Sequence, residues 1–436
     1  MTSTRSHVRL IVALTILVAA GTVHAAEPIV LQWWVPGTSE LRLQLYSAAG
    51  ELYNQQNPNV RIEVTNVGDG FIDKLQVAVA AGAQPDIVAI FGAPDVLTLA
   101  LAGALEPLND HLAKLPEWNE ADILPGFLET MSWDGKLWAL PIAAQPTSLV
   151  WGEDVFNRAG LAPIVGSIDE VQLSEYSRRL TTRGADGRLD QVGFLPDMWG
   201  GFIHWAYHWG ADVFDEAAQK VTLTTPAVVA AMEWMENHYQ SLGGIDAVNQ
   251  WKGLFRGSGT PAMYLGKQGM AIWSHYHHYF STLYGDGYRY GFAPPPLMGS
   301  DEWGPKGPIA HTDGRAVVKG SPHPLEATKF LLFITQGDGF PIVAEGYPST
   351  SVSYNRRLME ENLLPDWMSR ELWMQHLEVL LTVRSWPRTL ILGDLDRALD
   401  RATSDVMNGR ASVLSALEDA ERVLQAQLDQ ALNRGM

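Results

Sequence analysis

Aromatic side chains are the residues of this sequence best suited to bind something at a surface. The chain contains 16 Trp, 13 Tyr and 13 Phe among 436 residues. A large aromatic ring either packs in a core or lines a surface that binds something flat, because both faces of the ring are wide and apolar. Trp205 and Trp209 lie four residues apart, on one face of a helix, and we predict that both pack inside the protein. For the other tryptophans the composition leaves both roles open.

Patterns of catalytic or metal-binding residues are weak by comparison. Neither H-E-x-x-H nor G-x-S-x-G occurs, and a chain without cysteine has no disulfide, catalytic thiolate or Cys-ligated metal. His275, His277 and His278 have no carboxylate at matching spacing, so we expect a polar cleft wall there. The segment Asp186–Asp190 lacks the full series of regularly spaced oxygen ligands of a calcium-binding loop, so it predicts a turn. We expect no enzyme, no metal and no cofactor, although two well-placed carboxylates suffice for glycoside hydrolysis and 49 acidic residues leave that alternative open.

The acidic surplus excludes whole classes of partner. Lys and Arg number 31 against 49 Asp and Glu, which gives a formal net charge of −18. Nucleic acids and anionic membrane surfaces are held by clustered Lys and Arg, so we exclude both as partners. With 46% hydrophobic and only 18% charged residues, the chain can bury sizeable cores, and its length suits two or three domains.

The first 25 residues have the pattern of an export signal. Arg5 and Arg9 form a positively charged start, and Leu10–Ala20 is apolar but too short to span a bilayer. Val23-His24-Ala25 fits a small-residue cleavage site, so we expect cleavage near Ala25. No cysteine at this site can carry a lipid anchor, and an unanchored exported protein would diffuse away from a single-membrane cell. The periplasm of a two-membrane bacterium is therefore the expected location.

Strand and helix patterns alternate at the start of the mature chain. β-rich runs at Ile29–Val35, Val60–Val64 and Ile87–Ile90 are separated by helical patterns that begin near Ser39 and at Phe71. This order predicts parallel strands joined by crossover helices. Ligands bind at the carboxyl ends of such strands. The candidate loops are Pro36–Ser39, Val67–Gly70 and Phe91–Asp95.

From Trp133 onward the pattern indicates a crossover to a second lobe. Asp134-Gly135 marks a turn, Gly184–Gly210 is rich in Gly, Asp and aromatics, and Ala293–Pro308 is rich in Pro and Gly. The tail at Val413–Leu432 predicts a surface helix with one buried stripe. Strands are predicted at Leu137–Ile142, Ser148–Trp151, Gly269–Trp273 and Ala316–Val318, and helices at Pro226–Tyr239 and Pro324–Thr335.

Several ordered motifs resemble those of maltose-binding-type solute-binding proteins of ABC importers. Gly135–Ile142 reads G-K-L-W-A-L-P-I, Thr147–Phe156 reads T-S-L-V-W-G-E-D-V-F, and Ala159-Gly160 follows. Together they closely resemble that family's G-K-L-Y-A-L-P … L-Y-N-K-D-L-F … A-G signature. Trp151-Gly152 departs from the usual Tyr-Asn, a difference at the expected ligand subsite. Further matches, which extend the resemblance over nearly the whole mature chain, are Ala81-Gly82, Pro85–Ile87, Gly266, Gly269–Ile272, Pro322, Glu326-Ala327 and Gly346–Pro348.

The resemblance implies an α/β protein with the two-lobed periplasmic-binding-protein fold. Each lobe is expected to be a mainly parallel sheet flanked by helices, with the ligand in a cleft between the lobes. Two or three crossover segments would join them, so both lobes are discontinuous in sequence. We expect residues 26–143 and 313–348 in the N-terminal lobe, and residues 144–312 and 349–436 in the C-terminal lobe.

Motif positions imply a ligand site built from both lobes and the hinge. Phe91 and Asp95 follow the Pro-Asp-Ile strand, Gln145 follows Leu-Pro, and Trp273 with Tyr276 stands where an aromatic platform for a sugar ring is common. Asp86, by contrast, is expected to cap or turn the chain. The ligand-binding residues that the resemblance implies are Trp34, Thr38, Phe91, Asp95, Gln145, Trp199, Trp273, Tyr276, His311, Asp313, Arg384 and Trp386.

These residue types suit a sugar. A pyranose has apolar C–H faces and a rim of hydroxyls, so an aromatic ring buries a face while carboxylates and amides bind the rim. We expect a monomeric periplasmic receptor that captures a mono- or oligosaccharide by lobe closure and delivers it to the transmembrane subunits of an ABC permease. The alternatives are a secreted glycan-processing enzyme and a receptor for a polyol or phosphorylated polyol. Apart from Arg384 and Arg388, the proposed cleft loops hold few bases, which weighs against phosphate.

Overall fold

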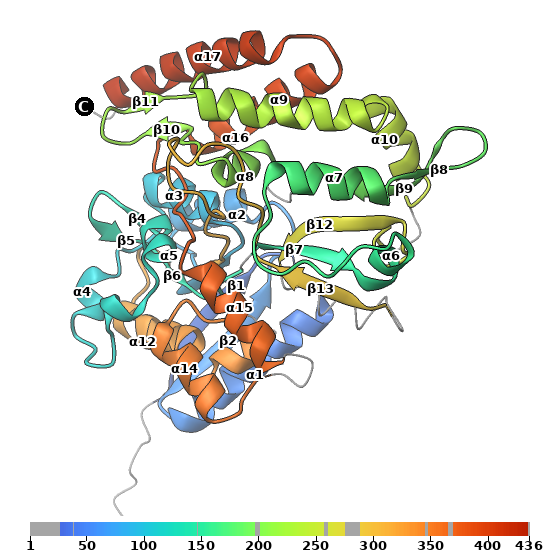
Figure 1. Cartoon of the computed structure of the whole chain (residues 1–436). Helices are drawn as coiled ribbons and strands as arrows, with labels where there is room; N and C mark the ends of the chain where they lie inside the picture. The colour runs from blue at the N-terminus through green and yellow to red at the C-terminus, as the bar shows by residue number, and fades with distance from the viewer. Residues whose placement is uncertain are drawn as a thin grey trace, which may run out of the picture.

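The computed structural model of the chain consists of two halves, each built on one five-stranded sheet (Figure 1). It describes residues 27–37, 39–145, 147–196, 201–256, 260–274, 288–344, 348–364 and 369–434. The predicted export signal at residues 1–25 lies outside these ranges, as do three predicted ligand-binding residues, Thr38, Trp199 and Tyr276. Among the helices of the described ranges, none combines the length and apolar character needed to cross a membrane.

The first sheet contains β1 (Ile29–Val35), β2 (Val60–Asn66), β3 (Ile87–Ile90), β6 (Leu140–Pro141) and β14 (Gly314–Val317), in the order β2-β1-β3-β14-β6. β1 is parallel to β2 and to β3, as the strand–helix alternation predicts. β14 returns from much later in the chain and runs antiparallel to β3 and β6. The helices that flank this sheet are α1 (Glu40–Gln56), α2 (Phe71–Ala81), α3 (Ala93–Leu101) and α12 (Pro324–Thr335).

The second sheet contains β7 (Thr147–Gly152), β8 (Thr182–Arg183), β9 (Leu189–Phe194), β12 (Gln268–Ser274) and β13 (Tyr290–Ala293), in the order β13-β7-β12-β9-β8. Only β12 and β9 are parallel, so the prediction of mainly parallel sheets is wrong here. The chain passes from the first half directly into β7. It later runs through β12 and β13 in the opposite direction, so both strands pair antiparallel with β7. The α/β class and the two-lobed arrangement are confirmed.

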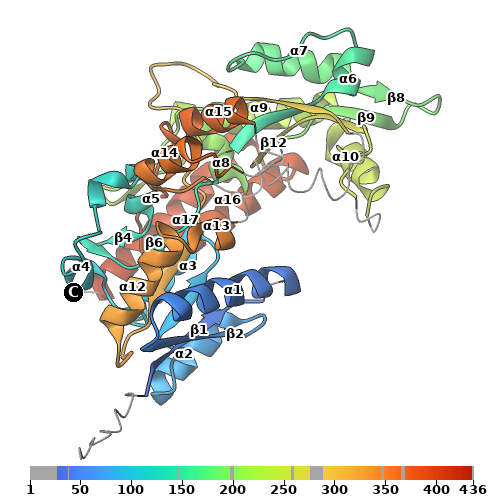
Figure 2. The same ribbon diagram turned by 90° about the horizontal axis from the view of Figure 1, so that it is seen from below.

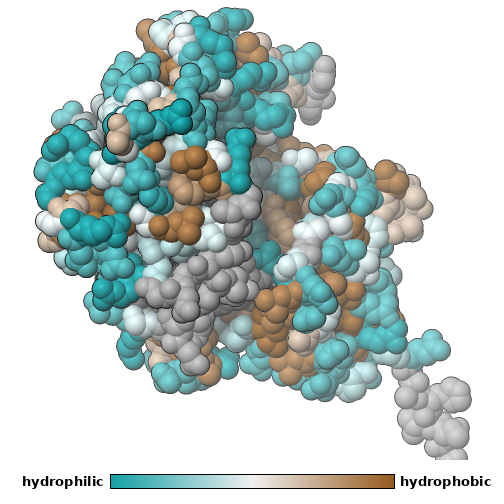
Figure 3. All heavy atoms as spheres, turned by 90° about the vertical axis from the view of Figure 1, so that its right-hand side faces the viewer, coloured by the Kyte–Doolittle hydropathy of each residue, from teal (hydrophilic) through white to brown (hydrophobic). Residues whose placement is uncertain are grey.

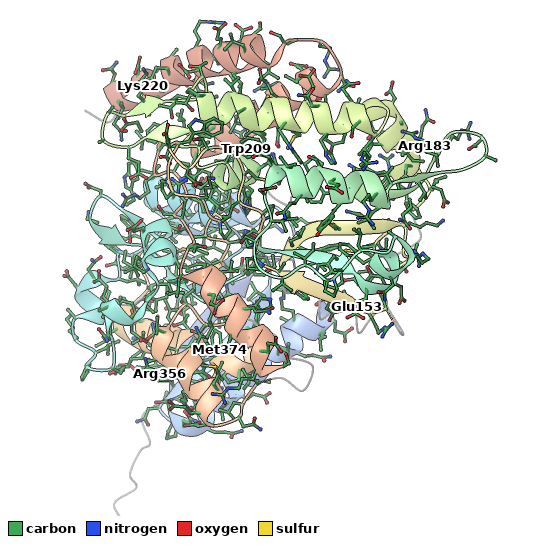
Figure 4. The ribbon with its side chains drawn as sticks, in the orientation of Figure 1. Glu153, Arg183, Trp209, Lys220, Arg356 and Met374 are labelled. Carbon is green, nitrogen blue, oxygen red and sulfur yellow. The ribbon has the colours of Figure 1, made fainter. Side chains whose placement is uncertain are left out.

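Long helices cover the second sheet on its outer side (Figure 1). The predicted tail helix has a buried stripe that includes Leu417, Leu424 and Leu428, while Leu414 and Val423 are exposed. Trp205 and Trp209 are almost fully buried, which confirms their packing role, and Figure 4 shows Trp209 in the interior of this half. The helices are α6 (Glu153–Arg158), α7 (Glu170–Leu180), α8 (Gly201–His208), α9 (Pro226–Ser241), α10 (Gly244–Gly253), α16 (Leu392–Met407) and α17 (Val413–Arg434).

Three segments that connect the halves run side by side as a hinge. The amide of Gln145 donates to the carbonyl of His311 over 3.0 Å, and the amide of Ala144 donates to the carbonyl of Pro348 over 2.8 Å. Seen from below, the two sheets stand apart and are joined through this region (Figure 2). The remaining elements are α4 (Asn109–Leu112), η1 (Glu120–Asp122), α5 (Pro125–Thr130), β4 (Ser132–Trp133), β5 (Lys136–Leu137), β10 (Phe214–Asp215), β11 (Lys220–Val221), α13 (Phe340–Val343), α14 (Val352–Glu360) and α15 (Arg370–Leu380).

Candidate functional site

The loops that follow β1 and β2 lie together at one edge of the first sheet. The strand register pairs Val35 with Asn66, and the amide of Gly37 donates to the carbonyl of Gly68 over 3.1 Å. A Cβ on residue 37 would lie 3.3 Å from the backbone carbonyl carbon of Gly68, so any larger residue would crowd the two loops. Two of the three predicted ligand loops therefore form one continuous edge.

The third loop, after β3, contacts the hinge. Oδ1 of Asp313 accepts a hydrogen bond from the amide of Gly92 over 3.3 Å, and its carbonyl accepts from the amide of Ile142 over 3.1 Å. Asp95 lies in the first turn of α3, where burial raises the pKa of its carboxyl group. Because the hinge segments meet the first sheet at this edge, the strand ends face the second half. The molecule has a recess between its two halves (Figure 3).

Two guanidinium groups lie near the ring of Phe91. The Cζ atoms of Arg42 and Arg315 are 5.4 Å and 6.0 Å from the centroid of its ring. These distances suit cation–π attraction, which orients a ring as well as stabilising it. Phe91, Asp95 and Asp313 are thus brought together at the strand ends, with a positively charged surrounding that the sequence did not predict.

Arg315 is the residue of this region that sequence reasoning missed. It is 1% exposed on β14, where Nη2 donates to the Tyr46 hydroxyl and Nη1 to the carbonyl of Gly314, each over 3.0 Å. Its Nε has no hydrogen-bond partner, and no carboxylate of the described residues lies within ion-pair distance of it. A charged residue inside the otherwise apolar strand Gly314–Val317 is the sequence signal that marks it.

We expect Arg315→Met to raise the free energy of unfolding by about 1–3 kcal/mol, since a buried charge without an ionic partner costs more in desolvation than its few contacts return. Methionine keeps the length of the side chain and removes the charge. Urea-induced unfolding followed by circular dichroism measures the change, with Arg188→Met on the exposed β8–β9 turn as the control. A less stable variant would show that the ring and hydroxyl contacts outweigh desolvation.

The hinge holds a second group of predicted residues. Gln145 and Trp386 are 8% and 6% exposed, and the indole Nε1 of Trp386 donates to the carbonyl of Ala310 over 2.8 Å. The ring of Trp386 packs edge-to-face on that of His204, with the two centroids 5.1 Å apart. The ring centroid of His311 is 6.2 Å from that of His204. Burial lowers the pKa of His311 to about 4. Trp386 therefore packs between the hinge and α8, without the free ring face of an open platform.

Arg384 lies at a separate cavity of about 710 Å³, which no other predicted ligand-binding residue lines. Its guanidinium forms an ion pair with Asp212 and stacks over the ring of Tyr207 at 4.3 Å. Arg388 forms an ion pair with Glu216 at 2.6 Å. The two bases that would have suited a phosphate group are therefore already neutralised by protein carboxylates.

Two predicted tryptophans are half-buried on strands. Trp34 follows the fully buried Trp33 on β1 and points to the other face of the sheet, as alternation along a strand requires. Trp273 lies opposite Ser148 in the β7–β12 pair, and its ring centroid is 6.3 Å from that of Tyr264. Both leave part of the ring accessible, as a stacking surface needs.

Asp86 is structural, as its motif position predicts. One carboxylate oxygen accepts from the amide of Gln32 over 2.9 Å, and the other accepts from the hydroxyl of Ser321 over 2.5 Å. In the described part of the chain, no group of three or more acidic or histidine side chains is arranged to hold a metal ion.

Comparison with known sequences identifies a family. The family model described as bacterial extracellular solute-binding protein matches residues 48–362. A putative binding protein of Brucella abortus is 23% identical over 336 residues, which cover 76% of this chain and 77% of that protein.

Solved structures share the fold. The sugar-binding protein MalE of Xanthomonas citri superposes with a TM-score of 0.76 at 18% identity, over 92% of this chain and 98% of that chain. The protein CpMnBP1 with mannotriose bound gives a TM-score of 0.72 at 22% identity, over 90% of this chain and 99% of that chain.

Proposed function

The chain belongs to the bacterial extracellular solute-binding protein family, and from that premise we propose that it is the substrate-binding component of an ABC importer for a carbohydrate. The observation that carries the proposal is the geometry between the halves. Loops at the carboxyl ends of β1, β2 and β3 face the second sheet across a hinge of three adjacent segments. Sugar-binding proteins among the solved structures share the fold.

The proposed site draws on both halves. Phe91, Asp95 and Asp313 provide an aromatic ring and carboxylates at the strand ends, and Trp34 and Trp273 provide half-buried indoles. Aromatic rings bind the C–H faces of a pyranose while carboxylates bind its hydroxyls. Thr38, Trp199 and Tyr276, which lie outside the described residues, complete the proposed set.

Hinge closure is the proposed mechanism. The lobes rotate as rigid bodies around the sugar. Their proposed division is residues 26–143 and 313–348 against residues 144–312 and 349–436, except that α14 (Val352–Glu360) moves with the first lobe, because the amide of Ser353 donates to Oδ1 of Asp122 over 2.8 Å. Only the closed form presents both lobes together to the transmembrane subunits of the permease. The export signal favours a protein that works in the periplasm. The net charge of −18 favours a monomer, because copies of equal charge repel one another.

Calorimetry and scattering on the purified mature protein test this function. Titration with mannotriose, maltotriose and monosaccharides should give one-to-one heats for at least one sugar without any product, whereas a glycan-processing enzyme would convert its sugar. Small-angle scattering should show a smaller radius of gyration at saturation with unchanged circular dichroism. Proven binding at an unchanged radius would place the site within one lobe and contradict closure.

Truncation of Trp273 should weaken sugar binding by about 2 kcal/mol, roughly thirtyfold, because it removes a stacking ring. Trp273→Ala is therefore expected to raise Kd while leaving the thermal midpoint nearly unchanged. Trp303→Ala is the matched control, since Trp303 is also half-buried but lines the cavity of Arg384. Equal affinities for both variants would remove Trp273 from the proposed site.

A further inference from the structure

A second cavity, of about 690 Å³, lies in the first half of the molecule. It is formed where the end of α1, the segment before η1, the end of α12 and the start of α14 meet. Small-molecule sites span about 300–1,000 Å³, so its size suits a ligand. None of the residues proposed for the site between the lobes lines it.

Two nearly buried tyrosines line this cavity with hydroxyl groups that no protein atom satisfies. Tyr53 and Tyr354 are 4% and 5% exposed, and neither phenolic oxygen makes a hydrogen bond to the protein. Neither phenolic oxygen is sealed from solvent, so each hydroxyl faces the cavity and can bind a ligand there. Burial raises the pKa of both phenols to about 12, so each remains a protonated donor at neutral pH.

The rest of the lining is polar but neutral overall. Glu117, Asn119 and Gln336 line the cavity, and their side chains make no hydrogen bond to the protein. Its two cations are already paired, Lys329 with Glu326 at 2.8 Å and Arg357 with Glu361 at 3.1 Å. The free groups therefore include both donors and acceptors, with no free cation to hold an anion.

An apolar surface lies beside these polar groups. Phe333 is half-buried, and its ring centroid is 5.0 Å from that of Tyr53 at an angle of 62°. Leu332 of the same helix also lines the cavity. An aromatic face beside amides, a carboxylate and phenols matches a pyranose, which presents an apolar face and a rim of hydroxyls.

We propose that this cavity is a second binding site, for a neutral mono- or disaccharide unit, on the first lobe. The chemical class follows from the lining of the cavity and does not depend on the proposed site between the lobes. An acidic peptide or a phosphate ester would leave its negative charge without a free cation there. The two phenols and the amides of Asn119 and Gln336 bind the hydroxyl rim, and Phe333 covers the apolar face.

Equilibrium dialysis of the full mature protein with radiolabelled mannotriose and maltotriose counts the sugars bound per chain. Wild-type protein should bind two molecules of at least one of these sugars, one tightly and one weakly. Tyr53→Phe and Gln336→Ala should each weaken the second event roughly tenfold, the effect of one lost hydrogen bond, and leave the first unchanged. Tyr53→Phe removes only an unsatisfied hydroxyl, so its thermal midpoint should not fall.

Two controls separate this proposal from the one for the recess. Gln427→Ala replaces an exposed amide of α17 and should change neither event, while Trp273→Ala should weaken the tight event alone. A single bound sugar at every concentration, or a second event that the Tyr53 and Gln336 variants leave intact, would overturn the second site and leave the first proposal standing. Loss of all binding in these two variants, with Trp273→Ala unaffected, would instead overturn the site between the lobes.

Discussion

Acidification from about pH 7 to about pH 4.5 is expected to cost the folded protein several kcal/mol of unfolding free energy. Three buried histidines carry this effect: burial lowers the pKa of His204 to about 3 and those of His208 and His311 to about 4, from an ordinary 6.5. Between these values the unfolded chain holds more protons than the folded protein. The stability present above pH 6.5 is therefore lost as the pH falls, by about 1.4 kcal/mol per pH unit for each ring.

Two carboxyl groups oppose the histidines, since burial also raises the pKa of Asp95. Burial and the neighbouring Asp400 raise the pKa of Asp396 to about 6. The folded protein therefore takes up this proton before the unfolded chain does, which adds stability as the pH falls below 6. Burial also lowers the pKa of His238, which opposes the effect of Asp95. The three histidines named first, set against Asp396, give a net loss of about 3 kcal/mol per pH unit.

Urea unfolding at a series of pH values measures this slope. His208→Leu removes one ring that is 1% exposed and has no hydrogen-bond partner on either nitrogen. The variant should lose about 1.4 kcal/mol less per pH unit than the wild type. His323→Asn, at the half-exposed start of α12, is the control and should keep the wild-type slope. A wild-type protein equally stable at both ends of the range would contradict the neutral burial of these rings.

Trp205→Ala should lower the free energy of unfolding by about 3–5 kcal/mol, because it leaves a large cavity in the core of the second half. Trp205 is fully buried, with its ring centroid 5.0 Å from that of Trp234 and 6.1 Å from that of Phe194. Thermal and urea unfolding measure the loss, and Trp303→Ala, from a half-buried position, should lose less. A Trp205 variant of wild-type stability that no longer binds sugar would reverse the packing and binding roles.

The positions of most elements followed from the sequence alone, although the strand predicted at Leu137–Ile142 is divided between β5 and β6 of two different sheets. The strands at Ile29–Val35 and Ile87–Ile90 and the helices at Phe71–Ala81 and Pro324–Thr335 lie where the patterns predict them. So do the buried Trp205 and the parallel pairing around β1. Side-chain periodicity and turn residues act over a few positions, so a single sequence carries this information.

The candidate site was only partly predictable. Motif positions indicated Phe91, Asp95 and Asp313, and the structure brings these three together. The same reasoning treated Arg384 and Trp386 as ligand contacts, yet one forms an ion pair with Asp212 and the other packs in the hinge. A motif position identifies a segment of the fold, but the neighbours of its side chains come from remote segments.

The sequence by itself therefore determined the local elements, the strand-end loops and the family, while the tertiary structure decided what those elements face. The antiparallel pairing of β7, the burial of Arg315 without an ionic partner, and the cavity that Tyr53 and Tyr354 share all depend on segments far apart in the chain. Arg315, for example, meets the hydroxyl of Tyr46 across 269 positions. Burial and hydrogen bonding are properties of such remote contacts, and local periodicity contains no information about which remote segments will meet.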